Sequence, residues 1–364
     1  MKQELTMSAP SAKPSATIEA YYTICPLLVA SNIAVELGLL DEEFHRVGAW
    51  PIYLRSLENN QGWLPHFRHS KERLFRDGGA IPAIWAKADL TDTTLIATTA
   101  AQKPGQILVR ADGKIRRIAD LKGRRIGVSR SQNTNRVDVM HAGAIQGITH
   151  SLEISGLTLS EVSIVEFKDD GDPLALKPAA KPADLWAQLR IRQQNPSKES
   201  QALAEGLVDA IYIGAGQAPT FLASGQFTVI EDLDRYPDWT LKNSHGPYTT
   251  VVNTQFAKDH PQIVVAFLRA SIRAGQWINA NRAAAAELFA QVTLHADPGH
   301  ITKTLNTTDF VPRLSAQNLA ALELKKNFLF HQGYLKKDFS IKDWADPSFL
   351  EQAHASFLPT AHVR

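Results

Sequence analysis

The amino-acid sequence predicts an α/β protein built from two lobes. Its 364 residues exceed the size of one ordinary hydrophobic core and suit two domains of common size. Segments rich in β-branched and aromatic residues alternate along the whole chain with segments whose apolar residues recur at helical spacing. The chain opens with a strand, a helix and a second strand, an order typical of a parallel sheet. These features favour an α/β class over an all-α or all-β class.

The first predicted elements follow the N-terminal leader. Residues 17–25 (TIEAYYTIC) have the composition of a strand, and residues 26–37 (PLLVASNIAVEL) have helical spacing. Proline at the first helical position and glycine just after the last one are the usual start and stop signals, and Pro26 and Gly38 occupy these places. A second short strand is predicted near residues 52–57.

The same alternation continues toward the C-terminus. The further predicted elements are a strand at 125–128 after a polar turn, a helix end, glycine turn and strand within 201–214, a strand at 248–252, and an alanine-rich helical stretch over 261–290. Residues 169–196 are rich in Lys, Pro, Ala and Gln. We expect them to form an exposed loop with one helical piece at 184–191.

Composition and charge exclude several classes of function. A hydrophobic content of 44% with 21% charged residues is typical of soluble globular proteins. The formal charge of +2 offers no case for nucleic-acid binding, and no apolar run is long enough to span a membrane. Residues 1–16 lack the apolar core of a secretory signal, so we expect a short disordered leader on a cytoplasmic protein. The single cysteine excludes an intrachain disulfide and suits a reducing compartment.

That cysteine, Cys25, lies at the predicted junction between the first strand and the first helix. A free cysteine is most commonly a small buried hydrophobic residue. Cys25, however, occupies the predicted helix N-cap, where Ser, Thr, Asp or Asn serves better. A sulfur there feels the positive end of the helix dipole, and such a junction opens on the crevice where α/β sheets bind ligands. Both interpretations stay open from the residues alone.

Residues 66–79 (HFRHSKERLFRDGG) are strongly basic. Such a run usually forms a solvated loop, but a functional interpretation requires only one or two side chains to point inward. Arg76 is the best placed, because Gly78 and Gly79 follow it and paired glycines let backbone N–H groups face an oxyanion. An arginine fork beside such amides suits a sulfinate, sulfonate or carboxylate. The sequence therefore predicts an anion site at Arg76.

The two histidines of this segment, His66 and His69, cannot be told apart by composition. A histidine in a loop is more often a surface residue than a catalytic one. No nearby cluster supplies three ligands at the spacing of a zinc site. In the middle of the chain, residues 128–133 (VSRSQN) follow a strand and are expected to open a helix. Ser129 is then either a ligand contact from the opposite side or a plain N-cap.

Three pieces of sequence, taken together, resemble the sulfonate- and thiamine-precursor-binding proteins. They are DLKGRRIGV at 120–128, GLVDA at 206–210, and PQIVVAFLRA at 261–270 leading to Gly275-Gln276-Trp277. The resemblance implies the two-lobed, type II periplasmic-binding-protein fold, with mixed sheets flanked by helices and a central cleft. It implies a first lobe of residues 17–108 and 239–364 and a second lobe of residues 109–238, after a leader of residues 1–16.

Other motifs resemble one family more specifically, the 2′-hydroxybiphenyl-2-sulfinate desulfinases, which cleave an aryl carbon–sulfur bond in fossil-fuel desulfurisation. That family has Tyr-x-x-Cys-Pro, His-Phe and Arg-x-Gly-Gly-x-Ile-Pro in this order, with its His and Arg spaced as His66 and Arg76 are here. The matching residues are Tyr22, Cys25, Pro26, His66, Phe67, Arg76, Gly78, Gly79, Ile81 and Pro82. The tail at 344–350 (WADPSFL) resembles the family's Trp-Ala-x-Pro-x-Phe-Leu.

This resemblance implies hydrolysis of an aryl sulfinate to sulfite and the arene, with no metal or organic cofactor. It implies Cys25 as the reactive group, either a nucleophile toward sulfur or a proton donor to the ring carbon. Arg76 would hold the sulfinate oxygens, and His66 would orient the thiol or bind the substrate's hydroxyl. The expected substrate contacts are Gly78, Gly79, Tyr22, Thr23, Phe67 and Ser129, with Trp63 and Trp85 as further aromatic candidates. We expect a monomer whose partner is a small aromatic sulfinate, with no nucleic-acid or membrane partner.

The sequence departs from the family pattern at two positions near the expected site. Ile24 stands where the family has a polar residue, and Asp77 where it has an aromatic one. We expect Asp77 to point outward to Arg73 or Lys71, because an anion site tolerates an unpaired carboxylate poorly. The alternative function is a non-catalytic binding protein for a sulfonate or pyrimidine-like ligand. A thiamine-pyrimidine synthase would require histidine- and cysteine-rich stretches, which one cysteine does not supply.

Overall fold

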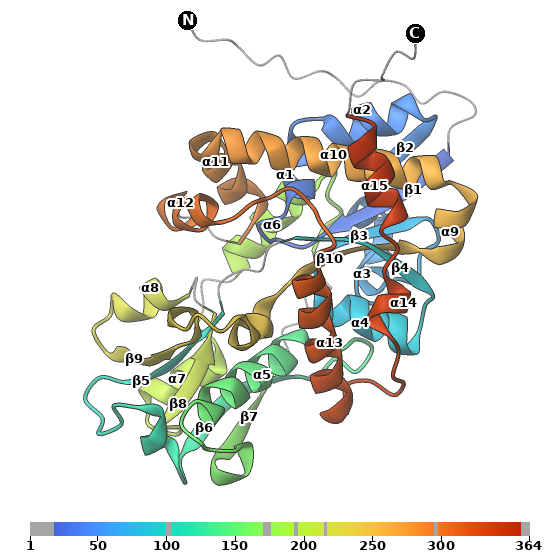
Figure 1. The fold of residues 1–364 in the computed structure, drawn as a ribbon. Helices are drawn as coiled ribbons and strands as arrows, with labels where there is room; N and C mark the ends of the chain where they lie inside the picture. The colour runs from blue at the N-terminus through green and yellow to red at the C-terminus, as the bar shows by residue number, and fades with distance from the viewer. Residues whose placement is uncertain are drawn as a thin grey trace, which may run out of the picture.

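The computed structural model describes residues 18–99, 104–169, 176–192, 196–214, 217–294 and 298–357. They form two lobes, each with a five-stranded sheet, that lie above and below one another in Figure 1. The expected leader, residues 1–16, lies outside the described residues, as do parts of the expected loop at 169–196. Among the described residues, no helix is long and apolar enough to cross a membrane.

The sheet of the first lobe has the strand order β2-β1-β3-β10-β4. Its strands are β1 (Ile18–Ile24), β2 (Ala49–Tyr53), β3 (Leu74–Gly79), β4 (Thr93–Thr99) and β10 (Tyr248–Asn253). β1 runs parallel to β2 and β3, whereas β10 runs antiparallel to β3 and β4. The sheet is therefore mixed, and the ends of β1 and β3 meet at the same edge.

Helices cover both faces of this sheet (Figure 1). The first face carries α1 (Ala30–Glu36), α2 (Leu39–Arg46) and α10 (Pro261–Ala280), and the second carries α3 (Trp63–Arg68), α4 (Ala80–Asp89) and α13 (Ala316–His331). Side chains alternate along β3 because successive residues of a strand face opposite sides. Phe75 packs into the first face and stacks on Phe267 of α10, with ring centroids 4.6 Å apart. Arg76 consequently points to the second face.

The second lobe has a mixed sheet of order β7-β6-β8-β5-β9. Its strands are β5 (Gln106–Arg110), β6 (Arg125–Ser131), β7 (Ser163–Asp169), β8 (Ala210–Ile213) and β9 (Phe227–Asp232), flanked by α5 (Val139–Glu153), α7 (Lys198–Ala204) and α8 (Ala218–Leu222). β5 pairs with β8 and β9. Residues 106–108 thus join the second sheet, although they were expected in the first lobe.

The remaining helices are α6 (Pro182–Arg192), α9 (Thr254–Asp259), α11 (Arg282–Val292), α12 (Pro298–Thr307), α14 (Ile341–Trp344) and α15 (Ser348–Ala355). The helical piece expected at 184–191 is confirmed as part of α6. Leu185 and Trp186 of this helix are buried in the core of the first lobe, although residues 109–238 were expected in the second. Apolar burial against α11, within the core that α1 also joins, explains this placement.

Several element boundaries differ from expectation for local reasons. The first strand is confirmed, but α1 begins at Ala30 rather than Pro26. The Asn32 side chain donates to the carbonyls of Cys25 (3.0 Å) and Leu27 (2.9 Å), which holds residues 25–29 in a turn. Cys25 is therefore not an N-cap, and the helix-dipole argument for its sulfur is wrong. Gly38 does end the helix, with a φ of 69°.

Three other predicted elements changed in extent. The strand expected at 52–57 is β2, and Leu54–Ser56 already form a turn of 3₁₀-helix. β6 continues through Ser131 and α5 begins only at Val139, where Asp138 is the N-cap, so the N-cap interpretation of Ser129 is wrong. The helical stretch at 261–290 is two helices, α10 and α11, which meet at Asn281.

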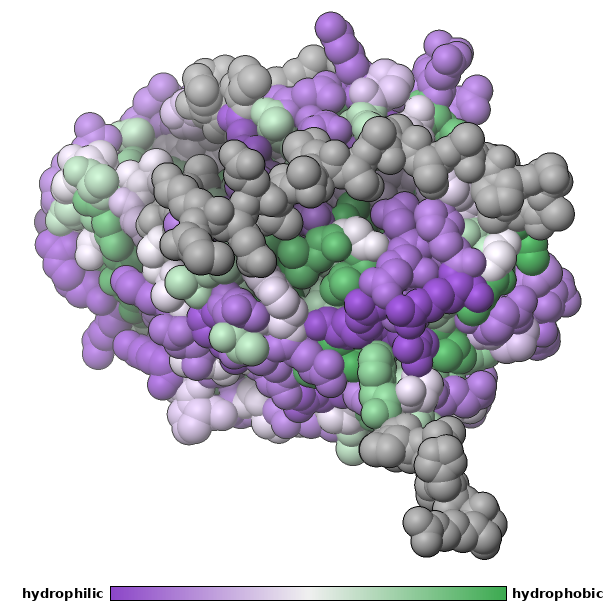
Figure 2. Space-filling model, turned by 90° about the horizontal axis from the view of Figure 1, so that it is seen from above, coloured by the Kyte–Doolittle hydropathy of each residue, from purple (hydrophilic) through white to green (hydrophobic). Residues whose placement is uncertain are grey.

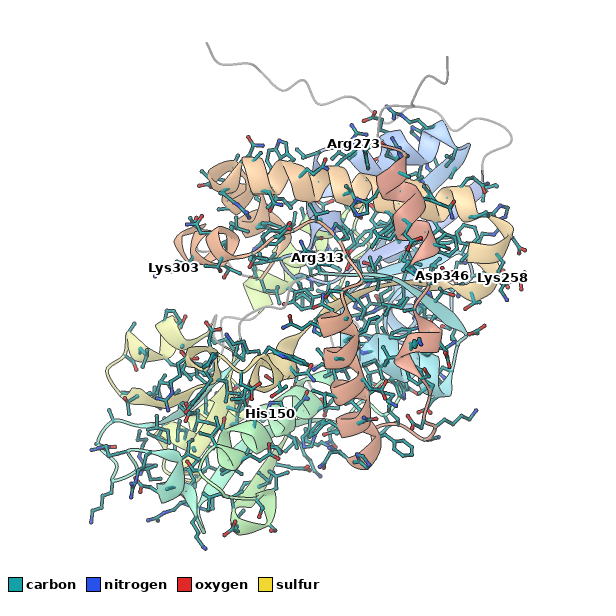
Figure 3. The ribbon with its side chains drawn as sticks, in the orientation of Figure 1. His150, Lys258, Arg273, Lys303, Arg313 and Asp346 are labelled. Carbon is teal, nitrogen blue, oxygen red and sulfur yellow. The ribbon has the colours of Figure 1, made fainter. Side chains whose placement is uncertain are left out.

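Ion pairs join two helices, α2 and α10, on the outer face of the first lobe. Arg273 of α10 binds Glu42 (2.9 Å) and Glu43 (2.7 Å) of α2, and Arg269 binds Glu43 at 2.9 Å. Arg273 is labelled at the top of Figure 3. Seen from above, hydrophilic side chains dominate this part of the surface, with smaller hydrophobic patches between them (Figure 2). The charged pairs thus join two helices that also share the apolar core beneath.

The two lobes contact each other through α13. Lys325 of this helix is 2% exposed and donates to the side chain of Gln146 on α5 (3.0 Å) and to the carbonyl of Ser244 (3.2 Å). Burial lowers the pKa of Lys325 to about 7. A hydrophobic cluster that contains Ile81 and Leu322 of the first lobe also includes Val137, just before α5. The lobe junction is therefore packed as well as hydrogen-bonded.

Candidate active site

Three of the side chains singled out from the sequence meet where β1 and β3 end. The Sγ atom of Cys25 lies 3.7 Å from Nε2 of His66 and 3.5 Å from Nη2 of Arg76, which donates to it. The backbone N–H of Cys25 donates to the carbonyl of Asp77 at 3.0 Å, which continues the β1–β3 pairing past the end of the strand. Cys25 is partly exposed. Its sulfur is thus fixed beside a histidine and an arginine, in a residue that is partly exposed.

Gly78 permits this close approach. A Cβ atom at this position would lie 2.3 Å from the sulfur of Cys25, far inside contact distance, and the φ of Gly78 is 154°. Only glycine adopts such a backbone without strain. Gly79 differs, because a Cβ atom there would meet nothing within 4 Å. The two glycines of the motif therefore have different structural roles.

His66 is buried in α3 and its ring orientation is fixed on both sides. Its Nδ1 lies 2.7 Å from the hydroxyl of Thr23, and its Nε2 faces Cys25. Burial, followed by the charges of Arg76, Arg55 and Arg136, holds the pKa of His66 well below its usual range. The ring is neutral, so one nitrogen donates and the other accepts. With Nδ1 protonated, Nε2 accepts from the thiol; with Nε2 protonated, it donates to the sulfur.

Arg76 is fully buried and three of its N–H groups have protein acceptors. Nε donates to the carbonyl of His66 (2.9 Å), Nη1 to the carbonyl of Gly79 (2.8 Å), and Nη2 to Cys25. Each terminal nitrogen carries a second N–H, for which the described residues show no recorded acceptor. The guanidinium is thus held rigidly, and two of its N–H groups lack a recorded acceptor among the described residues.

The glycine amides are arranged differently from the sequence expectation. Gly78 and Gly79 lie in β3, opposite Thr249 and Tyr248 of β10, and not in a loop. The Gly79 carbonyl accepts from Arg76. The glycines therefore contribute close packing and an acceptor from within a strand, and the expected loop at residues 78–79 is wrong.

Asp77 points away from the site, in a direction that the sequence did not suggest. It is 2% exposed on the α1 face of the sheet, where its Oδ2 accepts from the hydroxyl of Ser31 at 2.6 Å. The expected outward contact with Arg73 or Lys71 is therefore wrong; Lys71 instead lies over the ring of Tyr21 at 4.5 Å. Burial raises the pKa of Asp77 to about 6. The sheet separates this carboxylate from the side chain of Arg76.

The two histidines are now distinguished. His69 lies at the end of α3 with a φ of 53°, and its Nε2 is 3.0 Å from the carbonyl of Leu74. Burial is the main cause that lowers the pKa of His69 to about 3. His69 thus packs against its own turn, and only His66 faces the sulfur.

The other expected substrate contacts divide into two groups. Phe67 is partly exposed, and its ring centroid lies 4.9 Å from that of His66 and 4.9 Å from that of Trp63. Thr23 and Tyr22, in contrast, are buried: Thr23 contacts His66, and Tyr22 packs on Tyr53 in the first-lobe core. Both side chains belong to β1, an interior strand of the sheet, and have no recorded contact with the sulfur of Cys25 among the described residues.

Two further expected residues lie in other surroundings. Ser129 donates to the carboxylate of Glu199 on α7 at 2.5 Å and has no recorded contact with Cys25, His66 or Arg76 among the described residues. Trp85 of α4 packs against the cluster at the lobe junction. Neither is brought to the sulfur by the described contacts.

Sequence reasoning missed two arginines whose charges act on His66. Arg55 follows β2, is 4% exposed, and lies over the ring of Trp63 at 4.7 Å. Its place within the largely apolar stretch YLRSL was the signal for burial. Arg136 belongs to the segment between β6 and α5 and lies over the ring of Phe67 at 5.1 Å. No local pattern marks it.

No group of three or more His, Cys, Asp or Glu residues that could hold a metal ion is present in the part of the chain that the structure describes.

Comparison with known sequences finds a family model and a full-length relative. A family model described as NMT1/THI5 like matches residues 83–172. The 2′-hydroxybiphenyl-2-sulfinate desulfinase of Rhodococcus erythropolis is 28% identical over 360 residues, which cover 91% of this chain and 92% of that enzyme. This chain resembles the desulfinases throughout. The resemblance inferred from the Cys, His and Arg motifs is thereby confirmed.

Solved structures confirm the two-lobed fold. The desulfurization enzyme DSZB has a TM-score of 0.74 at 24% identity, with 94% of this chain and 100% of that chain covered. A cysteine-to-serine mutant of DSZB in complex with biphenyl-2-sulfinic acid has a TM-score of 0.69 at 24% identity, with 93% and 99% covered. The alkanesulfonate-binding protein SsuA from Xanthomonas axonopodis pv. citri, bound to MOPS, has a TM-score of 0.59 at 19% identity, with 93% and 100% covered.

The packing of Gly78 predicts the effect of Gly78→Ala. The added methyl group would displace the sulfur, so we expect thiol modification at Cys25 to change in rate and the protein to lose about 1–3 kcal/mol of stability. Reaction with a chromogenic thiol reagent and urea unfolding measure both effects. Gly79→Ala, which adds the same methyl group to open space, is the matched control. Identical behaviour of the two variants would contradict the assigned packing.

The burial of Asp77 predicts a pH-dependent stability. Its pKa of about 6 in the folded chain exceeds the usual value near 3.8, so the folded state retains a proton that the unfolded state releases. Stability therefore falls as pH rises from about 4 to 6, by about 3 kcal/mol in total. Asp77→Asn should remove this loss. Urea unfolding at several pH values compares the two proteins, in which all other titrating groups are shared. If the stability of the two proteins changed with pH in the same way, the raised pKa of Asp77 would be refuted.

Proposed function

We propose that this chain is a cofactor-independent desulfinase, which hydrolyses an aryl sulfinate similar to 2′-hydroxybiphenyl-2-sulfinate to sulfite and the arene or phenol. The observation that carries this proposal is the contact of one partly exposed cysteine with a neutral histidine and a buried arginine. The 28% identity to the Rhodococcus desulfinase over nearly the whole chain supports the same reaction. A binding protein for sulfonates requires no such cysteine.

The reaction breaks the carbon–sulfur bond, adds a proton to the ring carbon and adds hydroxide to the sulfur. In one route, the Cys25 thiolate attacks the sulfinate sulfur, and the electron pair of the C–S bond goes to the ring carbon, which takes a proton. Water then releases sulfite and regenerates the thiolate. In the other route, the thiol donates its proton to the ring carbon, sulfur dioxide departs, and its hydration to hydrogen sulfite returns a proton to the sulfur. His66 serves either route, because its Nε2 accepts from a thiol or donates to a thiolate.

The proposed roles of the neighbours follow from their contacts. Arg76 binds the sulfinate oxygens through the N–H groups that the protein does not use, and Thr23 holds the ring orientation of His66. Phe67 provides an aromatic surface beside His66 for the ring system of the substrate. We further propose a location in the cytoplasm, since the lone cysteine suits a reducing compartment.

A panel of aryl sulfinates tests the proposal directly. We expect the purified protein to release sulfite from biphenyl-2-sulfinates, and Cys25→Ser to abolish that release while ligand binding and fold persist. Sulfite is measured colorimetrically and binding by calorimetry. Tight binding with no sulfite from any member of the panel would instead support the solute-binding alternative. Full activity of Cys25→Ser would exclude the cysteine.

The hydrogen bonds of Arg76 predict the effect of Arg76→Lys. Lysine keeps the charge but cannot reach the carbonyls of His66 and Gly79 while facing the sulfur, because it lacks the planar fork. Loss of one hydrogen bond to a charged group costs about 1.5–3 kcal/mol, so sulfinate affinity should fall by about tenfold or more. Arg73→Lys, at an exposed position on the preceding turn, is the matched control. An equal loss in both variants would show that general charge, not Arg76, holds the anion.

A further inference from the structure

The positive charge around His66 is not balanced by the described carboxylates. Arg76, Arg55 and Arg136 all act on the ring, and all three lower its pKa. Asp77, although adjacent to Arg76 in sequence, is buried on the opposite face of the sheet. The recorded side-chain partners of these arginines are carbonyls, a hydroxyl, an amide and the cysteine sulfur. Such a cluster favours binding of an anion.

Arg136 differs from the other two because the second lobe supplies it. It lies between β6 and α5, whereas Phe67, the ring under its guanidinium, lies in α3 of the first lobe. The next residue, Val137, is 6% exposed within the hydrophobic cluster that joins the lobes. The backbone of this segment is therefore anchored at the junction, and the side chain extends from there toward His66.

The hydrogen bonding of Arg136 is incomplete among the described residues. Its Nε is buried and has no recorded acceptor. Its Nη1 and Nη2 make only long contacts within their own segment, to the carbonyl of Val137 (3.5 Å) and the hydroxyl of Ser131 (3.4 Å). Arg55, in contrast, donates to the side chain of Asn60 at 2.7 Å. Buried donors are normally paired, so the partner that Arg136 lacks is best supplied by a ligand.

We propose that Arg136 is a substrate-binding residue that the second lobe adds to the site, where it holds the sulfinate opposite Arg76. This inference rests on the proposed desulfinase function and extends it. The anion then lies between guanidinium groups of both lobes, and the aromatic body of the substrate lies along Phe67. Arg136 selects for charge: it binds the sulfinate, and it contributes nothing to the affinity for the neutral phenol that remains after sulfite leaves.

The test compares a charged and a neutral ligand on the same protein. In the Cys25→Ser background, calorimetry measures binding of biphenyl-2-sulfinate and of 2-hydroxybiphenyl. Arg136→Met should weaken sulfinate binding by about ten- to hundredfold, the range for one hydrogen bond to a charged group, and leave 2-hydroxybiphenyl binding unchanged. Arg136→Lys should recover part of the sulfinate affinity, because it restores charge without the fork. Arg124→Met removes an exposed arginine of the same lobe and should change neither affinity.

Two results would overturn the proposal. If Arg136→Met and Arg136→Lys weakened the binding of both ligands equally, Arg136 would only support the ring of Phe67. Unchanged sulfinate affinity in both variants would show that it does not reach the ligand. Sulfite release by the unmodified protein is assayed separately. If the unmodified protein released no sulfite, the desulfinase function would be rejected. The difference in anion binding between the variants would still decide the role of Arg136.

Discussion

The site depends on one buried guanidinium. Arg76 joins three pieces of the first lobe, because it donates to the carbonyl of His66 in α3, to the carbonyl of Gly79 at the end of β3, and to the sulfur of Cys25 after β1. A buried charge is tolerated only when it is well hydrogen-bonded. Carbonyl oxygens provide those bonds without cancelling the charge. The same contacts therefore fix the geometry of the cysteine and the histidine and preserve a positive charge for an anion.

Strand alternation keeps that charge from being neutralised. In β3, Phe75 and Asp77 face the helices α1 and α10, and Arg76 faces α3. A carboxylate one residue away in sequence is thus separated from the guanidinium by the sheet. Its hydrogen bond with Ser31 holds it there. The second lobe adds positive charge from the other side through Arg136, so the two lobes contribute charge of the same sign to one place.

Much of this arrangement was predictable from sequence, and the rest required tertiary structure. Composition and periodicity identified the α/β class and β1, because these depend on local patterns, and the resemblance to the desulfinases implied the grouping of Cys25, His66 and Arg76. The start of α1 was missed because the side chain of Asn32, and not the proline signal, decides it. The direction of Asp77 was missed because residues 74–79 were treated as a loop. Arg136 was missed because its approach to Phe67 is a contact between lobes, which no local spacing records.

The solitary cysteine also determines how the site responds to oxidants. Cys25 is partly exposed, and its thiol is the only one in the chain. A sulfenic acid formed there has no second cysteine with which to condense into a protective intramolecular disulfide. Its repair therefore requires a thiol from outside the protein, and without one oxidation proceeds to the irreversible sulfinic acid. The residue proposed to release sulfite from a substrate sulfinate is then itself converted to a sulfinate.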